Sequence, residues 1–192
     1  MIADLRILVL CGCVAGYLPA SCLDDEKATI EEANDLLGSR GRVVQELMAI
    51  VRDREAGSEP EQELAAEAMR LLGRLRANEA TRLLVERVAF VEPKSGGTPS
   101  LPGSWRAVLP AAAALSEIGS PVIEPLLDQV ETTDDLNIRV STSVVLKSIL
   151  GVDLAIAAIE LRIRSVDDEP RKQRLILLRD RLDRVERKST LD

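Results

Sequence analysis

Residues 134–146 show the pattern from which the fold is predicted, with the sequence Asp-Asp-Leu-Asn-Ile-Arg-Val-Ser-Thr-Ser-Val-Val-Leu. Its apolar face continues a little further along the chain, and the members of that face are separated by steps of 4, 3, 1 and 3 residues. Side chains at this spacing share one side of an α-helix. The face consists of Ile138, Thr142, Val145, Leu146 and Ile149. The stretch therefore predicts an amphipathic helix whose buried face is apolar except at Thr142.

Two further stretches repeat this spacing upstream. One begins 31 residues before Ile138, and the other begins 43 residues before that one. Their members are Ala107, Ala111, Ala114, Leu115 and Ile118 in the nearer copy, and Leu64, Ala68, Leu71, Leu72 and Leu75 in the farther copy. Each of the three stretches is followed by a short turn and a second apolar stripe. The second stripes are Ala80, Leu83, Leu84 and Val88; Ile123, Leu126, Leu127 and Val130; and Ala155, Ala158, Ile159 and Ile163. The sequence therefore predicts three helical hairpins.

Glycine stands at the end of the first helix in two of these hairpins. Gly119 and Gly151 follow the last apolar member of their helices. A residue at this place often adopts a left-handed conformation, which glycine reaches without a steric penalty. Pro121 suits the start of the helix that follows Gly119, because the N–H group that proline lacks has no helical partner there. We therefore expect these residues to mark the hairpin turns.

The two ends of the array show weaker patterns. Upstream, Thr29, Ala33, Leu36 and Leu37 keep the steps 4, 3 and 1, and we expect Gly38 to end this helix before its partner begins near Val44. A degenerate hairpin of this kind is common at the end of a repeat array. Downstream, Leu175, Leu178, Leu182 and Val185 recur at steps of 3, 4 and 3. This pattern predicts an amphipathic helix that caps the last hairpin and turns its charged side chains to solvent.

The first 22 residues differ from the rest of the chain. Residues 7–18 form an uncharged apolar run, which is shorter than the roughly 20 residues that span a bilayer and fits the centre of a secretory signal peptide. We therefore expect an exported protein, either periplasmic or anchored to the membrane. The segment Leu-Pro-Ala-Ser-Cys at 18–22 resembles a bacterial lipoprotein signal and makes Cys22 a candidate for lipidation. Ordinary cleavage near Ala20, or a buried first helix in a cytoplasmic protein, are the alternatives.

The stretch at 134–146 resembles a HEAT-like repeat, the helical hairpin of many bacterial α-solenoids. An acidic turn, an aliphatic–Arg pair and an apolar run follow one another here as they do in that family. The resemblance places the turn aspartate at Asp135 and the helix arginine at Arg139. It implies that the aspartate caps its helix and that the arginine links neighbouring hairpins. Pro110 and Pro125, each inside an expected helix, also look HEAT-like and are expected to bend their helices.

The resemblance implies an all-α fold, a short α–α superhelix (solenoid) of three to four HEAT-like helical hairpins with a C-terminal capping helix. It covers residues 60–165 and extends weakly to 27–55. The expected segments are a signal peptide at 1–22, a degenerate N-terminal hairpin at 23–59, repeats at 60–91, 105–131 and 134–165, a Gly/Pro/Ser-rich loop insertion at 92–104, and an amphipathic capping helix at 167–188.

The composition removes several classes of chemistry. The chain has no histidine, and its three cysteines lie within the first 22 residues. The body of the chain therefore cannot form Ser-His-Asp or Cys-His nucleophile systems, or zinc sites with His or Cys ligands. No carboxylate pair has a spacing that calls for acid–base catalysis, and residues 131–137 lack the central glycine of a calcium loop. We therefore expect a protein that is not an enzyme and has no catalytic residues, cofactor or metal.

Charge argues against a nucleic-acid partner. The formal net charge is −7, and residues 160–188 contain 10 basic and 7 acidic side chains. The rest of the chain is therefore strongly acidic and would be repelled by phosphates.

The expected function is binding rather than catalysis. Stacked hairpins bury their apolar faces against one another and present an extended concave surface. We expect this surface to bind a protein partner, so that the chain is a non-catalytic scaffold or adaptor of the cell envelope. Trp105 and Arg106, which follow the loop at 92–104, are the candidate partner-binding residues together with Arg139. A cytoplasmic accessory or lyase-like subunit with ligand-handling activity is the alternative, and a structural envelope spacer is a third interpretation.

Overall fold

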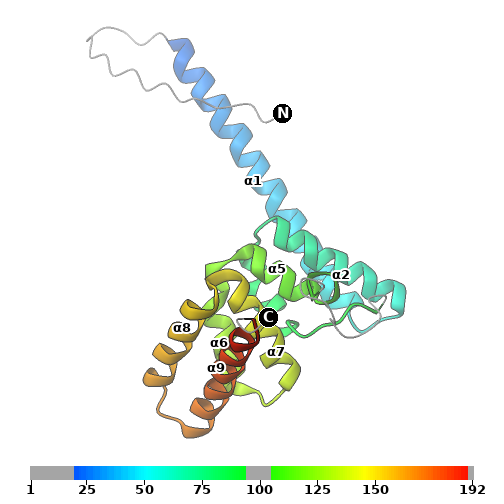
Figure 1. Ribbon diagram of the computed structural model, residues 1–192. Coiled ribbons are helices and arrows are strands. Elements are labelled where there is room, and N and C mark those ends of the chain that lie inside the picture. The colour runs from blue at the N-terminus through cyan, green and yellow to red at the C-terminus, as the bar shows by residue number, and fades with distance from the viewer. Residues whose placement is uncertain (1–19, 94–104, 190–192) are drawn as a thin grey trace, which may run out of the picture. The chain divides into compact units, whose positions relative to one another are not determined.

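The computed structural model describes residues 20–93 and 105–189, which form helices and turns without a β-strand (Figure 1). The prediction of an all-α fold is thus confirmed for this part of the chain. Two compact units divide the chain, residues 1–40 and residues 41–192. Most of the expected signal peptide and the loop residues 94–104 lie outside the described residues.

A single helix replaces the expected N-terminal hairpin. Helix α1 (Ala20–Arg54) runs through Gly38 without a break, so the prediction that Gly38 ends a helix within 23–59 is wrong. A methyl group added at Gly38 or Gly41 would meet no atom within 4 Å. Glycine at such open positions costs a helix about 1 kcal/mol relative to alanine, which weakens the helix without ending it. Residues 20–40 of α1 belong to the first unit, and residues 41–54 to the second.

The second unit follows the predicted order of hairpins. The first hairpin contains α2 (Glu59–Arg74), η1 (Asn78–Ala80) and α3 (Thr81–Glu86). The second contains α4 (Trp105–Val108), α5 (Pro110–Ile118), η3 (Ser120–Val122) and α6 (Ile123–Thr132). The third contains α7 (Leu136–Leu150) and α8 (Val152–Ser165), and α9 (Glu169–Ser189) follows it. The helices expected from the three pairs of apolar stripes are therefore present.

The core lies between the first helices of successive hairpins. Helix α2 packs against α5, and α5 packs against α7. All residues of α5 from 110 to 115 are buried, which makes α5 the central helix of this unit. Its contact with α2 is close, because a Cβ atom added at Gly73 would lie 2.5 Å from the Ala114 Cα atom. Glycine at 73 therefore allows the two backbones to approach each other.

Pro110 has a larger effect than the expected bend. Helix α4 ends at Val108, and Leu109 has φ −116° and ψ 78°, outside the helical region. Proline disfavours a helical conformation in the residue that precedes it, and at the first position of α5 its missing N–H has no cost. The expected single helix is therefore divided into α4 and α5. Pro125 lies in the first turn of α6, where a helical N–H partner is not required, and the helix continues through it.

The expected helix ends are confirmed at three places. Gly119 has φ 89° and Gly151 has φ 77°, so both adopt the positive φ that favours glycine. The Asp135 side chain caps α7 by accepting a hydrogen bond from the Asn137 N–H at 2.7 Å. A fourth end was not predicted: Ser58 precedes α2, and the Glu61 carboxylate accepts from its backbone N–H at 2.9 Å.

Helix α9 is not only a cover for the last hairpin. Its expected apolar residues Leu175, Leu178 and Leu182 are buried, which confirms their predicted face. The helix packs against α6 and α7 as well as α8. The expectation that its charged face meets only solvent is wrong at Arg174, which binds the Glu131 carbonyl and the Asp134 carboxylate. Helix α9 is thus built into the second and third hairpins.

Candidate functional site

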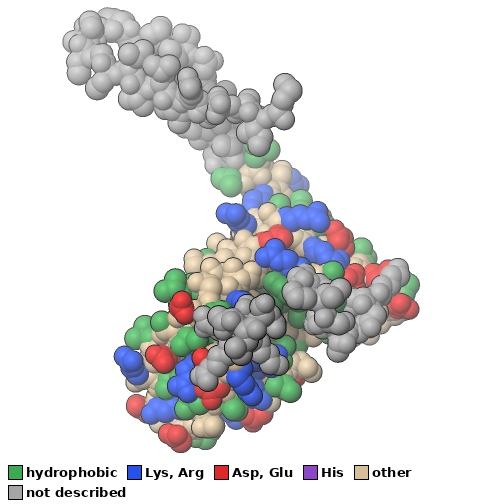
Figure 2. Space-filling model, in the orientation of Figure 1, with side chains coloured by type: hydrophobic (Ala, Val, Ile, Leu, Met, Phe, Trp, Pro, Cys, Tyr) green, Lys and Arg blue, Asp and Glu red, His purple; other side chains and the backbone are tan. Residues whose placement is uncertain are grey.

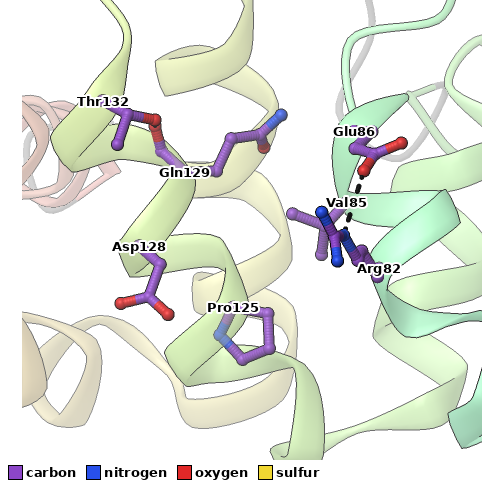
Figure 3. Close-up of a pocket in the computed structure, with 7 residues that line it drawn as sticks. All are labelled: Arg82, Val85, Glu86, Pro125, Asp128, Gln129 and Thr132. Carbon is purple, nitrogen blue, oxygen red and sulfur yellow. Dashed lines mark hydrogen bonds and ion pairs between the residues drawn. The ribbon is translucent and has the colours of Figure 1, made fainter.

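A groove of about 520 Å³ lies between α3 and α6 (Figure 3). These are the second helices of the first two hairpins, and they contact each other directly. Three lining residues come from α3 and four from α6. The residues are Arg82, Val85, Glu86, Pro125, Asp128, Gln129 and Thr132. The groove therefore lies where α3 meets α6.

The wall formed by α3 carries a pair of opposite charges. Arg82 Nε lies 3.3 Å from Glu86 Oε1, and Arg87 Nη1 lies 3.2 Å from Glu86 Oε2. The Arg82 side chain is 94% exposed, so its ion pair contributes little to folding. Val85 is buried and anchors this wall to the core. Arg82 is thus an exposed cation at the edge of the groove, held only by a weak surface pair.

The wall formed by α6 carries an acceptor without a donor. Gln129 extends from α6 toward α3, whereas Asp128 points away from α3 (Figure 3). The Gln129 Oε1 atom is shielded from solvent, and no donor in the described part of the chain reaches it. Thr132 Oγ1 donates to the Gln129 carbonyl at 2.9 Å and leaves the amide oxygen unpaired. A shielded acceptor without a donor costs about 1–3 kcal/mol, which a donor from a bound partner would recover.

A cluster of ion pairs lies on the other side of α6. Glu131 has a fully buried carboxylate and pairs with Arg162 of α8 and Arg171 of α9. The hydrogen bond that Arg162 donates to Glu131 raises the pKa of Arg162 above its ordinary value. Arg162 also pairs with Asp128 and, at 3.0 Å, with Glu124. Because Asp128 belongs to this cluster, the far edge of the groove is connected to the contacts that hold α8 and α9.

Arg174 completes the cluster at the turn after α6. Its Nε and Nη2 atoms donate to the two carboxylate oxygens of Asp134 at 2.8 and 3.1 Å, and its Nη1 donates to the Glu131 carbonyl at 2.8 Å. The hydrogen bonds between Arg174 and Asp134 lower the pKa of Asp134 and raise the pKa of Arg174. The charge of Arg139 also contributes to the lowered pKa of Asp134. Asp134 and Arg174 therefore form an ion pair that is lost only in acid.

The predicted partner-binding residues lie on other helices. Trp105 is half-buried and packs against the core, and the guanidinium carbon of Arg106 lies 5.2 Å from the centre of its ring. Arg106 Nη2 donates to Ser148 Oγ at 3.1 Å and so connects α4 to α7. Arg139 is half-buried in α7. None of the three is among the seven described residues that line the groove, and their role in binding stays a prediction.

The described start of the loop at 92–104 is fixed to the body. Arg70 of α2 pairs with both carboxylate oxygens of Glu92, and the hydrogen bond raises the pKa of Arg70. The same guanidinium donates to the Ala107 carbonyl at 3.1 Å, and the Glu92 N–H donates to the Val108 carbonyl at 3.0 Å. Arg70 therefore holds the beginning of the loop against α2 and α4.

Sequence reasoning missed both the groove and the ion cluster. One available signal was the acidic series Glu124, Asp128 and Glu131, whose steps of 4 and 3 place it on one side of a helix. The arginines that meet this series come from α8 and α9, up to 40 residues away. No local pattern pairs residues across such a distance.

The described residues contain neither a metal-binding cluster nor a membrane-spanning helix. No group of three or more acidic or Cys side chains in residues 20–93 and 105–189 is placed to hold a metal ion. Among the same residues, every helix is too short or too polar to cross a bilayer. Family models, curated proteins and solved structures give no match to this chain.

Proposed function

We propose that this protein is a non-catalytic scaffold of HEAT-like helical hairpins that binds a partner protein in the groove between α3 and α6. Two packing relations support the solenoid part of the proposal. The first helices of the hairpins, α2, α5 and α7, contact one another in order, and the second helices α3 and α6 do the same. Hairpins that bury their faces on neighbours in sequence order are typical of repeat proteins. In keeping with the leader-like residues 1–22, we place its action in the cell envelope.

The unpaired Gln129 oxygen is the observation that carries the binding part of the proposal. A shielded acceptor lowers the stability of the free protein, so it is normally satisfied within the fold. Here it belongs to a side chain that lines an open groove, next to the exposed guanidinium of Arg82. A partner segment laid between α3 and α6 would supply an acceptor to Arg82 and, once the Gln129 amide turns into the groove, a donor to Gln129. This pair of contacts is suited to a peptide group or a polar side chain.

Site-specific photo-crosslinking tests the proposal. A photo-reactive residue at Arg82 or Thr132, both exposed on the groove, should yield an adduct with one discrete protein in the source cells. The matched control is Glu117, which is exposed on α5 and does not line the groove. Equal adducts from Glu117 and the groove positions, or no adduct from either groove position, would contradict the proposal.

The variant Gln129→Leu separates binding from folding. Leucine has a similar volume and removes the unpaired oxygen, so the free energy of unfolding should stay the same or rise by about 1 kcal/mol. The adduct from Thr132 should nevertheless weaken several-fold, because the partner's donor loses its acceptor. A variant that is equally stable and binds its partner with unchanged affinity would show that Gln129 has no part in recognition.

A further inference from the structure

Helix α8 has a second apolar face that no other described helix covers. Ala155 and Ile159 are buried on its inner side, where α8 packs against α7 and α9. On the outer side, Leu154 is 63% exposed and Leu161 is 69% exposed. Ala157 between them is exposed as well. Figure 2 shows apolar side chains among charged ones over this helix, which lies at the edge of the ribbon in Figure 1.

The geometry of this face is that of a helix-pairing surface. Leu154 and Leu161 are seven residues apart, which is two helical turns or about 10.5 Å along the axis. Residues at this spacing share one side of the helix, with Ala157 and Ala158 between them. Small side chains at the centre allow a second helix to approach closely, while the two leucines fill the space on either side. A neighbour would therefore bury both leucines at once.

The charged residues at the two ends of this face have opposite signs. Asp153 stands at the start of α8 and Arg164 near its end, and both are exposed. An 11-residue separation places them on the same flank of the helix. When two copies of α8 lie antiparallel with Leu154 of each against Leu161 of the other, Asp153 of each copy comes next to Arg164 of the other. A twofold axis keeps the same flank on the same side in both copies, so two ion pairs form.

We propose that α8 pairs with α8 of a second copy of this chain, in an antiparallel arrangement around a twofold axis. This self-association is separate from the partner groove, because α3 and α6 supply all seven groove residues. One helix pair buries less surface than the roughly 1,200 Å² of a stable interface. We therefore expect a reversible dimer with a dissociation constant on the order of 100 μM.

Charge reversal tests the arrangement of the two copies. Asp153→Arg alone creates two repulsive Arg–Arg contacts in a homodimer, and Arg164→Asp alone creates two repulsive Asp–Asp contacts. Each variant should dimerise roughly tenfold more weakly than the unaltered protein, since exposed pairs of charges have modest energies. Mixing the two full-length variants restores both opposite-charge pairs. Sedimentation equilibrium of the mixture, with one variant fluorescently labelled, should therefore show a heterodimer at the original affinity.

Apolar substitutions test the face itself. Leu154→Glu together with Leu161→Glu should weaken dimerisation at least about a hundredfold, because four leucines lose their cover in the symmetric contact. The matched control is Leu64→Glu on α2, where the leucine is 51% exposed, and this variant should leave dimerisation unchanged. Circular dichroism establishes that each variant is folded.

Three results would overturn this proposal. The unaltered protein could remain monomeric at 1 mM. The Asp153→Arg and Arg164→Asp variants could fail to restore affinity when mixed. Leu64→Glu could weaken self-association as much as the α8 variants. Each of these results would leave the groove and its partner-binding test untouched.

Discussion

The contact of α2 with α5 and the contact of α6 with α9 join neighbouring helices by opposite means. In the first, Gly73 and Ala114 bring two backbones together, and a single added Cβ atom has no room. In the second, Glu131 and Asp134 receive Arg171 and Arg174 through ion pairs and charge-assisted hydrogen bonds. The first contact depends on volume and the second on charge. One half of the same core is therefore sensitive to side-chain size, and the other to the protonation and pairing of a few groups.

Removing the central carboxylate should produce the largest effect. Glu131→Ala leaves Arg162 and Arg171 without their buried partner, and we expect the free energy of unfolding to fall by about 3 kcal/mol. Urea denaturation monitored by circular dichroism measures this change. The matched control is Glu124→Ala, which removes the 69% exposed member of the same cluster and should cost less than 0.5 kcal/mol. Equal losses for the two variants would show that the buried carboxylate does not organise the α6–α9 contact.

A substitution at the close contact of α2 and α5 should produce the second-largest loss of stability. Gly73→Ala places a methyl group against the Ala114 backbone, and overpacking of this kind should lower the free energy of unfolding by about 2 kcal/mol. Gly41→Ala is the control, because a methyl group at that position meets no atom within 4 Å. It should raise the free energy of unfolding by up to about 1 kcal/mol through its greater helix propensity. If both substitutions stabilise the protein, the proposed tight approach of the two helices is incorrect.

Acid should weaken the charged contact by a smaller amount. The pKa of Asp134 is lower in the folded protein than its ordinary value of 3.8 because Arg174 hydrogen-bonds to the ionised form. A lowered folded pKa contributes stability above the ordinary value, and this contribution disappears as the pH falls through the folded pKa. The difference in unfolding free energy between the natural protein and Asp134→Asn should therefore shrink from pH 5 to pH 2. Glu61 also has a lowered pKa, and it is present in both proteins, so their difference isolates Asp134.

The spacing of apolar residues predicted most of the helices. The prediction failed at Gly38, where a glycine was expected to end a helix. The spacing of Leu72, Val145 and Ile159 predicted buried positions, and all three are fully buried. The first member of the repeated face is less reliable, because Leu64 is half-exposed at the outer end of α2. A glycine such as Gly38, where an added methyl group would meet no atom within 4 Å, lowers the stability of a helix through its low helix propensity but does not end the helix. The spacing of apolar residues therefore predicted the type of an element better than it predicted the element's length.

The groove and the position of α9 could not be predicted in the same way. Both depend on which helices pack against each other. This packing is determined by many contacts between residues that are far apart in the sequence. The pairing of Glu131 with Arg171 spans 40 residues, and the groove joins Arg82 to Gln129 across two hairpins. Trp105, the single tryptophan of the chain, packs against the core, and its role in binding stays a prediction.

The return of α9 to the side of α6 has a consequence for the order in which the chain folds. Helix α5 contacts both α2 and α3 within residues 59–118, and these three helices can assemble while the ribosome is still adding the third hairpin. The carboxylate of Glu131 can form its ion pairs only after Arg162 and Arg171 have been synthesised, and Arg171 lies 40 residues further along the chain. Contacts of such long sequence separation form slowly. A nascent chain that stops near residue 165 therefore exposes the α9-binding surface of α6, and this surface is closed only after α9 has been synthesised.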